Sequence, residues 1–245
     1  MTDPLRGFFI TGTDTEIGKT LITALLTVGL HRHGIECCPV KPLATGGVSV
    51  DGRLVSEDSI TYGRIADCPE PLSVLNPFCL HRSASPHFAA ESERKIIQPQ
   101  EIVSSLMSLA QRYTVLLVEG IGGWLVPIRY DYLVADFAKD LGLPVILVSA
   151  NRLGTINHTL LTLASIRAYG IEPLGVIFTR ILRGESTDLE HNNISTVERI
   201  GKIDILGDVP FLDETLRNGT DKDLLWETIK NAIRWDRLIQ RLPTR

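Results

Sequence analysis

Cysteine is scarce in this sequence and is not spaced for cross-linking or for binding zinc. The 245 residues include four cysteines, which form no CxxC pair and have no histidine at zinc-finger spacing; they are Cys37, Cys38, Cys68 and Cys79. Disulfide frameworks and structural zinc sites depend on regular spacings of that kind. We therefore expect reduced cysteines with structural roles, and Cys37 and Cys38 fall in a segment expected to be a strand.

An excess of basic residues and a long apolar run are also missing. Lysine and arginine together number 25 and aspartate and glutamate 29, which gives a formal net charge of -4 at pH 7. Nucleic acid and anionic membranes are therefore not expected as partners. The apolar runs fall short of the roughly 20 residues that span a bilayer, and residues 1–4 do not begin a signal pattern. These features predict a cytoplasmic protein with small-molecule partners.

Apolar runs alternate with helical periodicity along the whole chain. Hydrophobic residues make up 44% of the sequence, enough for one large domain over residues 1–245. Continuous apolar runs predict buried strands at residues 8–10, 36–40, 115–118, 144–148, 174–179 and 205–211. Helical segments between them predict an α/β fold, a doubly wound and mostly parallel sheet with helices on both faces. The terminal segment 221–245 is expected to form an amphipathic helix, with a buried stripe at Leu224, Leu225, Ile229, Ile233 and Leu238.

The most informative motif is a glycine-rich stretch that follows the first apolar run. Residues 12–20 read GTDTEIGKT and match the GxxxxGKT phosphate-binding loop, and a helical apolar pattern begins directly after it. In a strand–loop–helix context, backbone N–H groups and the positive end of the helix surround a polyphosphate. Lys19 then reaches the terminal phosphates, and the Thr20 hydroxyl can ligate magnesium. The chain is therefore predicted to be P-loop NTPase-like.

Charged residues stand at or near the ends of two other predicted strands. Lys41 follows the strand at residues 36–40, and it could face the phosphates or be a solvated surface lysine; the residues alone leave both readings open. Glu119 ends a continuous apolar strand, which favours a role as the acidic partner of magnesium. Asp58 opens a helical stretch and could serve as its cap or as a first-turn charge.

These motifs together resemble the dethiobiotin synthetase family over residues 8–212. The ordered series is TGTDTE at 11–16, GKT at 18–20, KP at 41–42, ATG at 44–46, SPH at 85–87, VEG at 118–120, GGW at 122–124, LG at 153–154, INH at 156–158, Gly207, and VP at 209–210. The resemblance implies ATP- and magnesium-dependent carboxylation of 7,8-diaminononanoate with CO2 or bicarbonate. A carbamate and a carbamic-phosphoric anhydride would precede ring closure to dethiobiotin.

The resemblance also implies roles for individual residues. Lys41 and Lys19 would be catalytic, and Thr20, Asp58 and Glu119 would hold magnesium. The residues implied to contact ATP are Thr15, Glu16, Ile17, Gly18, Lys19, Thr20, Leu21, Asp58, Glu119, Gly120, Ile121, Gly122, Thr179, Arg180, Pro210, Phe211 and Leu212. Those implied to contact the substrate are Thr15, Thr45, Gly154, Thr155 and Asn157. Because the family lends the segment from Gly154 to Asn157 across a subunit interface, a homodimer is implied.

Two positions depart from the family pattern. Thr179 stands where well-known members have an asparagine that recognises adenine, and a hydroxyl cannot replace an amide that both donates and accepts. A weaker adenine preference is therefore a hypothesis for this chain. His191 stands where a tyrosine is usual near the substrate tail.

Three other functions compete with this interpretation. Partition-type and septum-positioning ATPases carry a lysine at the position of Asp14 that reaches across their dimer, so an acid there argues against them. Glutamine-dependent amide synthetases need a glutaminase domain with a nucleophilic cysteine, for which this chain has no spare length. A non-catalytic nucleotide-sensing module remains as an alternative, and it would bind nucleotide without releasing phosphate in response to a diamine.

Overall fold

The core of the protein is a six-stranded sheet in which every neighbouring pair is parallel. The computed structural model describes residues 5–183 and 188–242, so residues 1–4, which bear on the signal pattern, lie outside it. The strand order is β12-β11-β10-β1-β7-β2. The strands are β1 (Gly7–Gly12), β2 (Cys37–Val40), β7 (Val115–Glu119), β10 (Val145–Ala150), β11 (Gly175–Thr179) and β12 (Ile205–Val209). The predicted parallel sheet is confirmed, with β2, which contains Pro39, at one edge.

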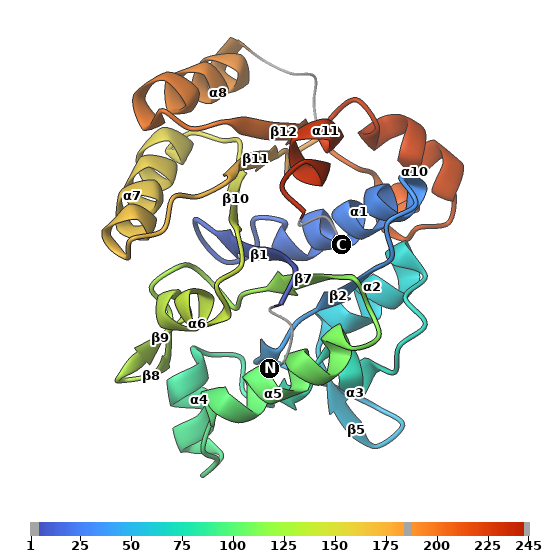
Figure 1. Ribbon diagram of the computed structural model, residues 1–245, viewed down its shortest axis with the longest axis vertical. Helices are drawn as coiled ribbons and strands as arrows, with labels where there is room; N and C mark the ends of the chain where they lie inside the picture. The colour runs from blue at the N-terminus through green and yellow to red at the C-terminus, as the bar shows by residue number, and fades with distance from the viewer. Residues whose placement is uncertain (1–4, 184–187, 243–245) are drawn as a thin grey trace.

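The main helices cover both faces of this sheet. They are α1 (Lys19–Arg32), α2 (Glu57–Ala66), α5 (Pro99–Ala110), α6 (Val134–Leu141), α7 (Thr155–Ala168) and α8 (Asp188–Gly201). Helix α1 packs on β1, β2 and β7 and against α2, while α7 packs on β10 and against α8. Figure 1 shows α1 and α2 on one side of the sheet and α6, α7 and α8 on the other. Because both faces are covered, the central strands β1, β7 and β10 are buried along their whole length, as in other parallel sheets.

Short elements connect these layers. Strand β3 (Leu43–Ala44) pairs with β6 (Phe78–Cys79), β4 (Val48–Val50) with β5 (Arg53–Val55), and β8 (Pro127–Arg129) with β9 (Tyr132–Leu133). The short helices are α3 (Leu72–Leu75), α4 (Pro86–Ser92) and α9 (Glu214–Arg217). The four cysteines are free, and Cys37 and Cys38 are buried.

The prediction of one long C-terminal helix is wrong. The described part of that segment forms two short helices, α10 (Lys222–Ile229) and α11 (Trp235–Ile239). Between them the backbone bonds to the edge strand β12: the Asp208 N–H donates to the Ala232 carbonyl at 2.9 Å, and the Arg234 N–H donates to the Leu206 carbonyl at 2.8 Å. These backbone groups satisfy the open edge of the sheet, so they are unavailable to a continuous helix. Residues 243–245 lie outside the described residues.

The two short helices and the segment between them still bury most of the predicted stripe. Leu225, Ile229, Ile233 and Leu238 are buried, whereas Leu224 is 51% exposed. Both helices pack on α1. The closest approach is at Gly29 of α1, where an added Cβ would lie 2.0 Å from the Trp235 ring. The glycine therefore makes room for the indole.

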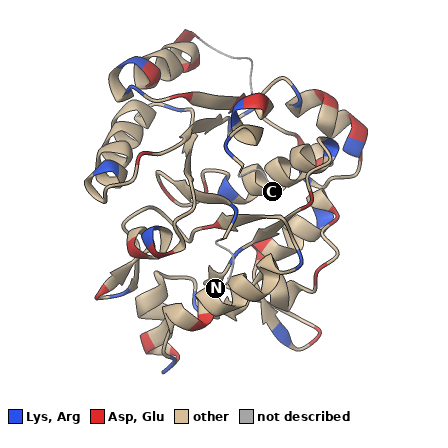
Figure 2. Cartoon of the chain, viewed as in Figure 1, with Lys and Arg blue, Asp and Glu red and all other residues tan. Residues whose placement is uncertain are grey.

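The outer helices carry charges of both signs. Figure 2 shows acidic and basic residues interspersed along α8 and α10. Among the described residues, none of the helices is long and apolar enough to cross a membrane.

We predict that Gly29→Ala destabilises the fold, because the new methyl group would overlap the buried Trp235 ring. Overpacking of this kind costs about 1–3 kcal/mol. Gly63→Ala in α2 is the matched control, since nothing lies within 4 Å of its added Cβ. Alanine should stabilise that helix by up to about 1 kcal/mol. Urea unfolding measures the free energy of unfolding of both variants. A change of the same sign in the two variants would contradict the packing argument.

Candidate active site

The carboxyl ends of the central strands open into a cleft of about 680 Å³. This is where ligands bind in doubly wound sheets. The cleft is lined by most of the residues that the sequence singled out, namely Thr15, Glu16, Gly18, Lys19, Thr20, Leu21, Lys41, Thr45, Asp58, Glu119, Ile121, Gly122, Thr179 and Arg180. It is also lined by residues that the sequence analysis missed, among them Ser56, Thr61, Arg64, Ile181 and Arg217.

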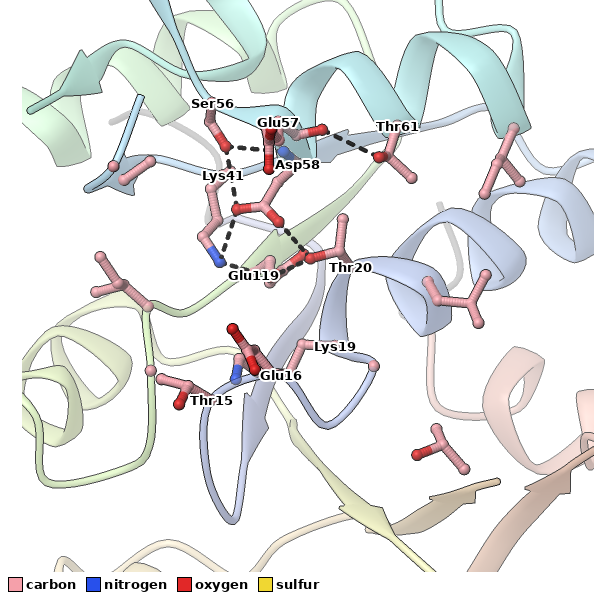
Figure 3. Close-up of a pocket in the computed structure, with 18 of the residues that line it drawn as sticks. Thr15, Glu16, Lys19, Thr20, Lys41, Ser56, Glu57, Asp58, Thr61 and Glu119 are labelled. Atoms are coloured by element: carbon pink, nitrogen blue, oxygen red, sulfur yellow. Dashed lines mark hydrogen bonds and ion pairs between the residues drawn. The ribbon is translucent and has the colours of Figure 1, made fainter. Parts of the chain in front are cut away.

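The phosphate loop has the predicted strand–loop–helix form. The loop follows β1, and Gly18 at the start of α1 adopts φ 96°, a left-handed conformation that favours glycine. Lys19 donates from Nζ to the Asp14 carbonyl at 2.6 Å, so its side chain folds back over the loop. Figure 3 shows Thr15, Glu16 and Lys19 on this side of the cleft. The positive end of α1 and the Lys19 ammonium thus face the same space, as phosphate binding requires.

Strand register brings Lys41 against Glu119. Val40 of β2 pairs with Val118 of β7, so the next residues of the two parallel strands are neighbours. Lys41 Nζ lies 2.5 Å from Glu119 Oε1 and 3.1 Å from the Gly120 carbonyl oxygen. Lys41 is 5% exposed and Glu119 1%. The reading of Lys41 as a solvated surface lysine is therefore wrong.

Helix α2 brings Asp58 to the same cluster. Its N-cap is Ser56, whose Oγ accepts from the Asp58 N–H at 3.0 Å, so Asp58 itself is a first-turn residue. The Asp58 carboxylate lies 3.2 Å from Lys41 Nζ and accepts a hydrogen bond from the Thr20 hydroxyl. The Thr20 hydroxyl oxygen also lies 3.0 Å from Glu119 Oε1. In Figure 3 these side chains point toward one another from α1, α2 and the ends of β2 and β7.

Asn76, which the sequence analysis missed, ties two of these elements together. Its buried amide donates to the Lys41 carbonyl at 2.8 Å and accepts from the Ser56 N–H at 3.1 Å. The end of β2 and the start of α2 are thereby fixed relative to each other. An asparagine at the end of a short helix gives no sequence signal of such a role.

Burial and charge set the protonation of the cluster. Burial alone would lower the pKa of Lys41, but the carboxylates of Glu119 and Asp58 raise it to about 12. Burial would raise the pKa of Asp58, and the Lys41 ammonium and the Thr20 hydroxyl lower it below its ordinary value. Burial and the like charge of Lys41 lower the pKa of Lys19 to about 8. Lys41 therefore stays charged, whereas Lys19 is charged at neutral pH and loses its proton as the pH rises through about 8.

The donor set at this cluster fits magnesium. Thr20 offers a hydroxyl, and Asp58 and Glu119 offer carboxylates, all within hydrogen-bonding distance of one another or of Lys41. Magnesium prefers oxygen ligands and is usually held by one or two carboxylates together with substrate phosphates. Among the described residues, no group of three or more histidine, cysteine or acidic side chains forms a metal site. A metal here would thus depend on nucleotide phosphates for its remaining ligands.

The residues predicted for the substrate fall into two groups. Thr15 and Thr45 line the cleft. Gly154, Thr155 and Asn157 lie at the start of α7 and are not among the described residues that line it. The Thr155 side chain is buried and lies 2.8 Å from the Ser149 hydroxyl, so it points into the core. The Ser149 hydroxyl also lies 3.5 Å from the Thr13 hydroxyl, so the start of α7 is connected to the phosphate loop through Ser149.

The cleft lining around Thr179 includes some of the residues implied to contact ATP and omits others. The Thr179 hydroxyl donates to the Ile17 carbonyl at 2.7 Å, and its methyl group lies beneath Gly18. Ile17 and Leu212 are core residues, and Gly120, Pro210 and Phe211 are not among the described residues that line the cleft. Instead, Arg217 lines it and stacks on the Phe211 ring at 4.8 Å. His191 lies on α8 and is not among the described residues that line the cleft.

Comparison with known proteins decides the family. A family profile described as "AAA domain" matches residues 6–218. The "ATP-dependent dethiobiotin synthetase BioD" of Halalkalibacterium halodurans is 34% identical, over 95% of this chain and 99% of the relative. Proteins of the same name from Aromatoleum aromaticum and Methanocaldococcus jannaschii are 39% and 38% identical, over 86% and 81% of this chain and 93% and 91% of theirs. The chain belongs to the ATP-dependent dethiobiotin synthetase family.

Solved structures of a different function share the fold of this family member. The MinC:MinD cell division complex of Aquifex aeolicus matches with a TM-score of 0.57 at 15% identity, over 97% of each chain. A ParA family ATPase from Chlorobium tepidum matches with a TM-score of 0.52 at 15% identity, over 96% of this chain and 97% of that chain. At this identity the likeness concerns the P-loop fold alone, and function has to be argued from the site.

We predict that nucleotide affinity falls as the pH rises above about 8, where free Lys19 loses its charge. Bound phosphate favours the ammonium, so the Kd for ADP should rise up to about tenfold per pH unit between pH 8.5 and 9.5. In Lys19→Arg the cation stays charged, and this dependence should disappear. Calorimetry in two buffers would also detect the proton taken up on binding. A constant Kd up to pH 9.5 would contradict the low pKa of Lys19.

The lowered pKa of Lys19 also sets the direction in which the free energy of unfolding changes with pH. The folded pKa of Lys19 lies below its ordinary value of 10.5, so the unfolded chain binds more protons between about pH 8 and 10.5. The Lys19 contribution to the free energy of unfolding therefore increases with pH across that window. The raised pKa of Lys41 acts in the opposite direction only above 10.5.

Proposed function

We propose that the chain is a magnesium-dependent cyclo-ligase that converts 7,8-diaminononanoate, CO2 and ATP into dethiobiotin, ADP and phosphate. The observation that carries the proposal is the cluster of Lys19, Lys41, Thr20, Asp58 and Glu119, which joins a phosphate loop to an open cleft. The sequence relatives bear the same enzyme name over nearly the whole chain. The remaining features of the proposal are a cytoplasmic location and a homodimer.

The proposed reaction has three balanced steps. One amine of the substrate attacks CO2 and releases a proton, which gives a carbamate. A carbamate oxygen then attacks the γ-phosphorus of ATP, the bond to the bridging oxygen breaks, and ADP leaves with a carbamic-phosphoric anhydride formed. Finally the second amine attacks the anhydride carbon, the carbon–oxygen bond to phosphate breaks, and phosphate and a proton leave as the ring closes.

Concentrated positive charge is what this chemistry requires of the protein. The carbamate and the γ-phosphate are both anions, so their approach is opposed unless cations stand between them. Lys19 and Lys41 are buried at the cleft and supply two such charges. Magnesium held by Thr20, Asp58 and Glu119 would neutralise charge on the phosphates. Thr15 and Thr45 line the same space, and their proposed role is to orient the substrate.

Lys41 has to change partners in this scheme. In the structure its ammonium contacts Glu119, Asp58 and the Gly120 carbonyl. Those carboxylates are also the proposed metal ligands, so a divalent cation and the ammonium compete for them. Binding of magnesium with ATP would therefore release Lys41 toward the transferred phosphoryl group.

The substrate tail is proposed to be bound between two copies of the chain. Gly154 and Asn157 are exposed at the start of α7, and the neighbouring Leu153 is 83% exposed. The backbone N–H groups at a helix start suit a carboxylate such as that of the diaminononanoate tail. Because this segment lies outside its own cleft, the partner's cleft is its proposed target.

We predict phosphate release from ATP that depends on 7,8-diaminononanoate, magnesium and bicarbonate, together with formation of dethiobiotin detected by mass. Nucleotide binding without a response to the diamine would instead support the sensing alternative.

The same assay with GTP and CTP tests the base preference. The Thr179 hydroxyl already donates its proton to the Ile17 carbonyl, so it has no proton left to donate to a base. Rates with GTP and CTP within about tenfold of ATP are expected if adenine is read weakly.

We predict that Lys41→Ala lowers turnover on the order of 10²–10³-fold, since it removes a charge that stabilises the transition state. Divalent cation binding should not weaken, because the competing ammonium is gone from Glu119 and Asp58. Mn2+ titration in the presence of ADP checks this second effect. Lys139→Ala, at an exposed position of α6, is the control and should leave rate and stability nearly unchanged. Retained turnover in Lys41→Ala would remove this lysine from the mechanism.

A further inference from the structure

Tyr62 is the largest polar side chain buried beside the proposed metal site. It lies on α2 four residues after Asp58, so both residues face the same side of that helix. Tyr62 is 0% exposed, and its hydroxyl donates to Glu119 Oε2. It is not among the described residues that line the cleft, so its hydroxyl reaches Glu119 from the core side.

The two oxygens of Glu119 therefore have different environments. Oε1 faces the cleft, where it meets Lys41 Nζ and the Thr20 hydroxyl. Oε2 faces the core and meets Tyr62. The terminal torsion of a glutamate is broad and roughly two-fold, so packing alone does not fix the plane of the carboxylate. A donor on each side does fix it.

This arrangement matters most when the contacts on the cleft side change. If a metal replaces the Lys41 ammonium, as the proposed function requires, Oε1 exchanges its partner while Oε2 keeps its own. A carboxylate held at one oxygen presents the other in a constant direction. Partners of this kind orient metal ligands in many sites, and their loss typically weakens metal binding by about 10- to 100-fold.

We propose that Tyr62 is a positioning residue for divalent cation binding, and that its hydroxyl holds the Glu119 carboxylate so that Oε1 faces Thr20 and Asp58. The inference deepens the proposed function and rests on its assignment of Glu119 to the metal. A purely structural tyrosine would affect unfolding but would leave the cation affinity of the folded protein unchanged. The two roles are therefore separable by measuring that affinity.

The test is a titration of the full chain with Mn2+ in the presence of ADP, in which electron paramagnetic resonance measures the concentration of free Mn2+. Tyr62→Phe keeps the buried ring and removes the hydroxyl, and it should raise the Kd for Mn2+ about 10- to 100-fold. Tyr113→Phe is the matched control, because its hydroxyl also donates to a carboxylate, that of Glu70 at 2.9 Å, outside the cleft. Its Kd should stay within about twofold of the unaltered chain.

Enzyme kinetics give a second readout. At saturating magnesium Tyr62→Phe should recover most of its turnover, while the magnesium concentration for half-maximal rate rises by the same factor as the Kd for Mn2+. The affinity for ADP without metal should not change. An unchanged Kd for Mn2+ in a folded Tyr62→Phe sample would overturn the inference.

Two further variants keep the outcomes distinguishable. Glu119→Gln should weaken Mn2+ binding on its own, and adding Tyr62→Phe to it should bring little further loss if the hydroxyl acts through Glu119. If Glu119→Gln has no effect, the proposed metal assignment fails, whatever Tyr62 does. If Glu119→Gln weakens binding and Tyr62→Phe does not, only the positioning role fails. ADP stabilises the folded state of Tyr62→Phe during the titration, and the comparison of Glu119→Gln with and without Tyr62→Phe is a second measurement of the same contact.

Discussion

The ammonium of Lys41, buried between two carboxylates, is the contact on which the site depends. Lys41 and Glu119 are almost completely buried, so each charge requires the other. Removing one partner from such a pair costs roughly 3–5 kcal/mol, because the remaining charge stays buried without compensation. The contact therefore holds the ends of β2 and β7 together and draws in Asp58 from α2. The cleft is built before any nucleotide enters it.

The same contact limits what the free enzyme can do. While Lys41 neutralises Glu119 and Asp58, its charge is directed at the protein and away from a substrate. A divalent cation carries enough charge to replace it on both carboxylates, and oxygen ligands suit that cation. One cluster thus supports the fold in the absence of ligand and, under the proposed function, supplies a mobile cation when ligand binds. Strain or conflict with local rules is common at such sites.

Much of this arrangement follows from sequence rules, and its limits are physical. Apolar runs and the GxxxxGKT motif predicted the sheet and the loop. The strand-end rule put Lys41 and Glu119 at the carboxyl ends of two strands, but it left open whether Lys41 faces the phosphates or the solvent. The roles of Asn76 and Tyr62 were not predicted, because they depend on which helices and strands pack together, and residue spacing does not encode that packing. The prediction of one C-terminal helix was wrong for a related reason. Helical periodicity carries no information about the unpaired edge of β12, and the backbone around Ile233 forms hydrogen bonds to that edge.

The shared fold of MinD- and ParA-type proteins also shows where function parts from architecture. The phosphate loop of this chain carries an acid, Asp14, four residues before Gly18. Here the Asp14 side chain accepts the Thr15 N–H at 2.7 Å, and its carbonyl accepts Lys19. An acid at this position would repel a partner's phosphates, so a nucleotide-sandwiched dimer is disfavoured. Under the proposed function, a second copy would instead approach through the start of α7 and would leave the phosphate loop to its own chain.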